Sequence, residues 1–184
     1  MFLLKWGRRS ETPDPAANAW SSAAMDPIEV YTADTRVSGW LTSGGQRLTD
    51  LLNQATEVRI WRPAARPLFA EADGASPAAA PDGEWYNLAT DDILVAMPPD
   101  RVSHRQVRVH RQLQLTRLEI GPFQITGGLH VPPGAPVEAY LMRYQHRFVP
   151  LTDATVAHMG QVESEQSVDV AIVNIRQVLS IQAG

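Results

Sequence analysis

The stretch RVSGWLT at residues 36–42 is repeated in outline by QITGGLH at residues 124–130, 88 residues later. In both, a polar residue is followed by a β-branched residue, a small hydroxyl residue, a glycine, a variable position and a leucine. A Gly/Pro-rich turn comes next in each case, SGG at 43–45 and PPG at 132–134. An ordered series of matching segments at nearly constant spacing indicates a tandem duplication.

A short helix is expected after each turn, at residues 47–53 and 136–142. Apolar residues at positions i, i+3 and i+4 give each helix one apolar face. These residues are Leu48, Leu51 and Leu52 in the first helix, and Val137, Tyr140 and Leu141 in the second. Each helix is therefore expected to cover the core of its own unit.

Strands complete both units. They are expected at residues 28–31, 36–42, 57–61, 84–88 and 92–97, and again at 118–120, 124–130, 146–150, 167–173 and 177–181. Five strands this short cannot bury both faces as a flat sheet, so each unit should curl into a small barrel. Gly39 and Gly127 would lie at its strong bend, where a side chain would collide with the neighbouring strand. The predicted fold class is all-β with short helices, a tandem of five-stranded barrels.

The pattern predicts three parts of the chain. Residues 1–27 form an N-terminal docking segment and linker, 28–100 the first barrel, and 101–184 the second barrel with a leading strand. The Pro/Ala/Gly-rich residues 63–83 are expected to be a disordered loop insertion. Residues 101–116 alternate in polarity, which predicts a half-buried strand. The side chains expected on its buried face are Val107, Val109, Leu113 and Leu115.

Composition excludes several classes of protein. The 184 residues are 44% hydrophobic and include no cysteine, which rules out disulfide frameworks, cysteine zinc sites and thiol nucleophiles. No run approaches the ~20 consecutive apolar residues of a membrane-spanning helix. The net charge of −4 gives no overall attraction to nucleic acid.

The two predicted barrels differ in charge. Residues 28–100 hold five arginines against eleven acidic residues, a net −6, and residues 101–184 hold eight arginines against six, a net +2. Opposite charges favour contact between the first unit of one copy and the second unit of another. Self-association of the chain, head to tail, is therefore one expected mode of interaction.

The series of motifs resembles a bacterial family of small β-domain proteins known only as a domain of unknown function. The resemblance depends on an RLTDLLN helix at residues 47–53 and an LTDA tail at residues 151–154, and covers roughly 28–62 and 118–184. The first unit lacks the tail, and the second has PVE at 136–138 where the helix motif would begin. The resemblance implies SH3-like or Sm-like barrels and no known activity.

The N-terminus is apolar and then basic, the reverse of the order in a secretory signal. We expect a docking peptide that buries its apolar residues in a protein partner or at a membrane surface while its arginines stay outside. Its contact residues would be Phe2, Leu3, Leu4, Trp6, Arg8 and Arg9. The predicted location is the cytoplasm, with residues 1–9 able to reach the inner face of the membrane; a loose terminus is the alternative.

An RNA-binding role is the main alternative function. Arginines cluster at residues 101–117, and clustered arginines suit phosphate contacts. The candidate contact residues are Arg105, Arg108 and Arg111. Strand alternation places Arg108 on the opposite face from the other two, and no aromatic residue is interleaved for stacking. RNA binding is therefore ranked below protein binding.

Catalysis is the least favoured class. The five histidines show no metal-ligand spacing, and no phosphate-binding or nucleophile-elbow motif occurs. Asp91 and Asp92 are adjacent and are interpreted as a turn before the last strand of the first unit. A triad assembled from distant residues stays open. The sequence predicts no catalytic residue, no metal site and no cofactor.

Trp40 is the leading contact candidate in the body of the chain. The matching position in the second unit is Gly128, so the repeated pattern does not require its bulk. Tryptophan is enriched at binding hot spots, although Trp40 could equally fill a larger core. The predicted function is a non-enzymatic protein–protein interaction module, acting as a scaffold or accessory subunit of a bacterial assembly.

Overall fold

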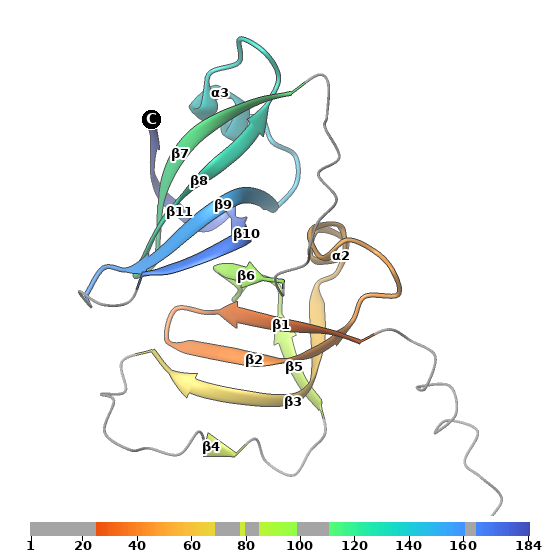
Figure 1. Cartoon of the computed structure of the whole chain (residues 1–184). Coiled ribbons are helices and arrows are strands. Elements are labelled where there is room, and N and C mark those ends of the chain that lie inside the picture. Colours follow the sequence, from red (N-terminus) through yellow and green to blue (C-terminus); the bar gives the residue numbers. More distant parts are fainter. Residues whose placement is uncertain (1–24, 69–77, 80–84, 99–110, 161–164) are drawn as a thin grey trace, which may run out of the picture.

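The computed structural model of the chain describes residues 25–68, 78–79, 85–98, 111–160 and 165–184. These ranges are mostly β-strand, with two short α-helices (Figure 1). Strands of the first half are β1 (Met25–Tyr31), β2 (Thr35–Thr42), β3 (Glu57–Pro67), β4 (Ala78–Ala79), β5 (Trp85–Ala89) and β6 (Val95–Met97). Those of the second half are β7 (Gln112–Ile120), β8 (Phe123–Val131), β9 (Phe148–His158), β10 (Gln166–Asn174) and β11 (Val178–Ala183).

The two helices lie where the sequence predicts them. Helix α2 spans Leu48–Gln54 and helix α3 spans Val137–Met142. Leu52 of α2 is buried, as are Val137 and Leu141 of α3. Between the strands predicted at residues 167–173 and 177–181 lies a single 3-10 turn, Ile175–Gln177, in which the Asn174 side chain accepts from the Arg176 N–H. No helix within the described ranges is long and apolar enough to cross a membrane.

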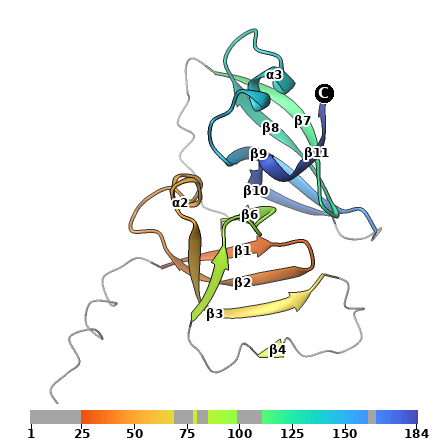
Figure 2. The ribbon, with the colours of Figure 1, turned by 180° about the vertical axis from the view of Figure 1, so that it is seen from behind.

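All the described strands belong to one antiparallel sheet that does not close. Its order is β11-β7-β8-β9-β10-β6-β1-β2-β3-β4, and β5 pairs with β3 beside β4. The expectation that two barrels close separately is therefore not met. The physical reason is the pairing of β6 with β10, which satisfies the outer edge of β6 from the other half of the chain. Figure 2 shows this connection from behind.

Strand pairing follows the same order in the two halves. The order is β6-β1-β2-β3-β5 in the first half and β11-β7-β8-β9-β10 in the second. The hairpin registers also correspond, because Ile28 lies opposite Gly39 and Thr116 lies opposite Gly127. After each of these glycines the second strand of the half pairs through a leucine, with Leu41 opposite Ile60 and Leu129 opposite Leu151.

Both glycines lie at a break in the register. The β2–β3 register shifts between Ser38 and Trp40, and the β8–β9 register shifts between Thr126 and Gly128. A Cβ on Gly127 would lie 3.0 Å from the Cβ of Ala154 and 3.1 Å from that of Leu151. The predicted close approach of strands is therefore confirmed at Gly127. Asp153 and Ala154 of β9 lie opposite Gly127 at this shift, and Asp153, within the LTDA tail, has a φ of 48°.

The loop insertion is shorter than predicted. Strand β3 continues through residues 63–67, where Ala65 pairs with Val37 and Pro67 pairs with Thr35. Pro63 lies at the register shift, where a missing N–H is tolerated. Two further residues of the expected loop, Ala78 and Ala79, pair with β3 as strand β4. The rest of the expected loop lies outside the described residues.

The predicted buried face of the strand at 101–116 is wrong where the structure describes it. Leu113 and Leu115 are 52% and 57% exposed, whereas Thr116, Leu118 and Ile120 are fully buried. Strand β7 has the opposite phase because its apolar residues change parity between Leu115 and Leu118. Burying Leu118 and Ile120 under β8 takes Leu113 and Leu115 to the outer face. Val107 and Val109 lie outside the described residues.

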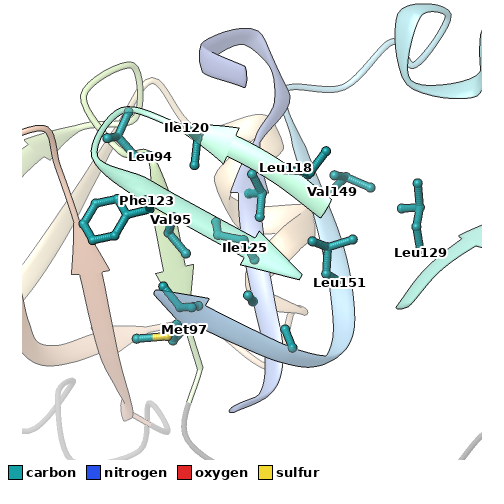
Figure 3. Close-up of a cluster of buried hydrophobic side chains, with 14 of the residues drawn as sticks. Leu94, Val95, Met97, Leu118, Ile120, Phe123, Ile125, Leu129, Val149 and Leu151 are labelled. Atoms are coloured by element: carbon teal, nitrogen blue, oxygen red, sulfur yellow. The ribbon is translucent and has the colours of Figure 1, made fainter. Parts of the chain in front are cut away.

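Two hydrophobic clusters lie in the described part of the chain, and each takes residues from both halves. The cluster around Phe123 and Ile125 includes Val95 and Met97 of β6 (Figure 3). A second cluster, with Val30 and Ile60 of the first half among its members, includes Phe148 of β9 and Ile172 of β10. The strands at the centre of the sheet therefore belong to a shared interior.

Candidate interaction surface

Three of the five tryptophans form a row across neighbouring strands of the first half. Trp40 of β2 lies opposite Trp61 of β3, which in turn lies opposite Trp85 of β5. Directly paired residues of antiparallel strands share a face of the sheet. Pro27 of β1 pairs with Trp40 and extends the row by one strand. These aromatic side chains, here called the tryptophan row, lie on one face.

The tryptophan row lies on the outer face. Its neighbours in sequence, Leu41 and Ile60, are buried at 4% and 0% exposure. Side chains alternate across a strand, so Trp40 and Trp61 point the other way. Trp40 is 42% exposed, and the other two tryptophans are half-buried. Trp40 therefore lies at the surface and does not fill a larger core.

An arginine packs against the end of the tryptophan row. The guanidinium carbon of Arg59 lies 4.8 Å from the ring centroid of Trp85, within the range of a cation–π contact. Arg59 lies two residues before Trp61 on β3 and therefore shares its face. The row combines large flat apolar surfaces with a positive group at one side, which is the composition typical of binding hot spots.

A cluster of charged and polar side chains lies at the hairpin between β1 and β2. Arg36 forms an ion pair with Glu29, with 2.6 Å between Nη2 and Oε2. The Tyr31 hydroxyl donates to the other oxygen of the same carboxylate. Burial, together with this hydrogen bond, raises the pKa of Tyr31 above the usual range for a phenol. The cluster holds its charges in mutual contact and has a structural role.

The structure describes two of the predicted contact residues. Trp40 lies on the outer face as described above, and Arg111 immediately precedes β7. Arg111 donates from Nη1 to the His130 carbonyl at 3.2 Å, with the Tyr140 hydroxyl 3.4 Å away. It is bound to β8 and α3 of its own half. The other predicted contact residues lie outside the described ranges: Phe2, Leu3, Leu4, Trp6, Arg8, Arg9, Arg105 and Arg108.

Asp91 and Asp92 lie in a turn, as predicted. Asp91 has a partner in the other half, because Arg147 Nη1 lies 2.7 Å from its Oδ1. The same nitrogen donates to the buried Thr90 hydroxyl at 2.6 Å. In the described part of the chain, no group of three or more histidine, aspartate or glutamate side chains is arranged to hold a metal ion.

Sequence reasoning missed the polar contacts that join the two halves. The Asn53 side chain bonds both backbone groups of Phe148, and the Asn174 side chain donates to the Ile93 carbonyl at 3.0 Å. Asn53 is the last residue of the RLTDLLN motif, so the motif was the available signal. A contact between Asn53 and the other half of the chain leaves no periodic pattern in the sequence, so the sequence does not reveal this contact.

Comparison of the chain with protein-family models, with curated proteins and with solved structures finds no match. The resemblance to the bacterial small β-domain family therefore stays a prediction.

Proposed function

We propose that this protein is a non-enzymatic protein–protein interaction module, acting as a scaffold or accessory subunit of a bacterial assembly. The tryptophan row is the observation that carries the proposal. Large aromatic side chains at a surface contribute much of the binding energy of protein interfaces. Trp40, at 42% exposure, is the member of the row most available to a partner.

We further propose that the two halves are copies of one SH3-like or Sm-like unit. The identical order of strand pairing in the two halves supports this, as do the corresponding registers at Gly39 and Gly127. The proposed units share a sheet and an interior, so they would act as one rigid body and present the tryptophan row on a fixed platform.

The proposed partner is an apolar peptide segment of neutral or basic character. The indole faces of the row favour apolar and cationic groups. The first half carries a net −6 from five arginines and eleven acidic residues, so a phosphate backbone would be repelled there. This supports a protein partner over RNA at this surface.

The N-terminal segment is proposed as a second docking element. Its apolar residues, Phe2, Leu3, Leu4 and Trp6, would bury in a partner or at the inner face of the membrane, with Arg8 and Arg9 outside. A cytoplasmic protein with this peripheral contact is the proposed location. Deleting residues 1–9 should leave folding intact and remove co-sedimentation with partner or vesicles; unchanged association would reject this element.

The main experiment compares capture by the full chain and by a Trp40→Ala variant. Proteins retained by the wild type from native extract should be lost, by tenfold or more, on the variant, since hot-spot truncation costs about 2 kcal/mol or more. Met142→Ala is the matched control, because Met142 is 85% exposed on the other half. Equal capture by wild type and Trp40→Ala would overturn the proposed surface.

A further inference from the structure

The two halves of the chain are joined by a short antiparallel pairing of β6 with β10. Ile172 lies opposite Ala96, Val173 lies opposite Val95, and the Asn174 N–H donates to the Leu94 carbonyl at 2.9 Å. Strand β6 is the one that pairs with the first strand of its half. Strand β10 is the one that pairs with the third strand of its half.

In each half, the strand that corresponds to the other half's junction strand lies at an end of the sheet. Strand β11 pairs with β7, the first strand of the second half, and so matches β6. Strand β5 pairs with β3, the third strand of the first half, and so matches β10. Among the described strands β11 pairs only with β7, and β5 pairs only with β3. Each end of the sheet therefore carries one of the two strand types that meet at the junction.

In β11, the residue that directs its backbone N–H and C=O groups outward corresponds to the residue of β6 that bonds to β10 at the junction. Ile181 lies opposite Leu118, just as Ala96 lies opposite Val30. The Gly184 N–H donates to the Leu115 carbonyl at 2.9 Å, and antiparallel bonding alternates, so the N–H of Ile181 points away from β7. Ile181 therefore directs its backbone groups outward, as Ala96 directs its own toward Ile172.

Strand β5 has the complementary phase. The Thr90 N–H donates to the Thr56 carbonyl at 2.9 Å, which places the backbone groups of Leu88 toward β3 and those of Asn87 away from it. Counting along the paired strands, Asn87 takes the place that Ile172 has in β10. The two outward-pointing residues, Ile181 and Asn87, are thus the counterparts of the pair that bonds at the junction.

The side chains of these two strands do not protect the edges. Natural edge strands are usually guarded by charged residues or proline. Neither type occurs in β11, VLSIQA, or in β5, WYNLA. Leu179 is 74% exposed and Tyr86 is 42% exposed, so each edge adds a large apolar side chain. The register irregularity of β11 falls at Leu179, and residues 180–183 pair regularly.

We propose that β11 of one copy pairs antiparallel with β5 of the next, with Ile181 opposite Asn87, and so repeats the β6–β10 junction between molecules. The contact is head to tail and joins the more basic half of one copy to the acidic half of another. Such a contact gives a ring of three or more copies where the rotation closes and an open chain where it does not. The proposal rests on the interaction role proposed above and names a second copy as the partner at the sheet edges.

The test measures the mass of the full chain by light scattering and sedimentation over a range of concentrations. The wild type should grow beyond a dimer as concentration rises. Ile181→Pro and Asn87→Pro each remove an outward N–H and should each be monomeric, with association weakened at least about tenfold. An equimolar mixture of the two variants retains one intact edge of each kind, so it should stop at a dimer.

Charged variants keep the test decisive where proline disturbs folding. Leu179→Asp and Tyr86→Asp should give the same two monomers and the same mixed dimer, with circular dichroism unchanged. Leu113→Asp is the control, since Leu113 is 52% exposed and lies outside both edge strands, and it should assemble as the wild type does. A wild type that is monomeric throughout, or that stops at a symmetric dimer, would overturn the proposal. This result would not decide whether a partner binds through Trp40, which the Trp40→Ala variant tests separately.

Discussion

The side chain of Asn53 brackets the backbone of Phe148 across the two halves of the molecule. Oδ1 accepts from the Phe148 N–H at 2.7 Å, and Nδ2 donates to the Phe148 carbonyl at 3.0 Å. Phe148 itself is fully buried in the second cluster. The amide of one helix residue thus takes the place of a neighbouring strand at the start of β9.

Replacing Asn53 by alanine should destabilise the whole fold. Two backbone groups of a buried residue would lose their partners, which costs about 2–3 kcal/mol in free energy of unfolding. Urea unfolding followed by circular dichroism measures this. Gln54→Ala, at the exposed neighbouring position, should change the value by less than about 0.5 kcal/mol. Equal stabilities of the two variants would show that the bracket contributes nothing.

Arg147 and Asp91 should contribute unequally to their shared contact. The Asp91 side chain is 76% exposed, so Asp91→Asn should cost less than about 1 kcal/mol. Arg147→Ala also removes the donor to the buried Thr90 hydroxyl and should cost about 1–3 kcal/mol. Chemical denaturation of both single variants and the double variant provides the comparison. A larger loss for Asp91→Asn would mean that the ion pair dominates.

Local structure could be predicted from this sequence because short-range signals determine it. The helix after each Gly/Pro turn follows from the i, i+3, i+4 spacing, and Leu52 and Leu141 are buried as that spacing requires. The close approach at Gly127 follows from a glycine inside an apolar strand. The sequence does not determine whether Trp40 is exposed, since an indole fits a core as well as a surface.

Long-range pairing could not be predicted in the same way. In the β6–β10 junction, the backbone groups at the edge of β6 can pair with any strand of suitable length. Nothing in the sequence around Val95 or Val173 identifies the other as its partner. The phase of β7 was ambiguous because Leu115 and Leu118 have opposite parity. The structure buries Thr116 with Leu118, and the Thr116 hydroxyl donates to the Gln114 carbonyl at 3.2 Å.

Gly127→Ala should be destabilising although the substitution adds one methyl group. The new Cβ would approach the Cβ atoms of Ala154 and Leu151 to 3.0 and 3.1 Å, and β9 would have to move. Such overpacking costs about 1–3 kcal/mol. Gly160→Ala is the control, because its Cβ would meet only the His158 ring at 3.6 Å. Thermal unfolding of the two variants should separate them by several degrees; coincident curves would contradict the close approach.

The raised pKa of Tyr31 predicts a loss of stability at high pH. Burial and the hydrogen bond to Glu29 keep the phenol protonated in the folded chain, whereas the unfolded chain ionises near the ordinary value of about 10. Above that pH the folded state binds one more proton than the unfolded state, so the free energy of unfolding falls as pH rises. Tyr31→Phe should show a shallower fall over the same range, measured by urea unfolding at stepped pH. A steeper fall would contradict the sign.

The phase of β7 can be tested with two substitutions of the same kind. Leu118→Ala removes a fully buried side chain and should cost about 2–5 kcal/mol, whereas Leu115→Ala removes one that is 57% exposed and should cost less than about 1 kcal/mol. Denaturant unfolding with an unchanged m-value in both variants gives the comparison. The reverse order of the two losses would place Leu115 in the interior. In that case the strand would have the phase predicted from alternation at residues 101–116, and the exposed leucines would no longer belong to the outer face.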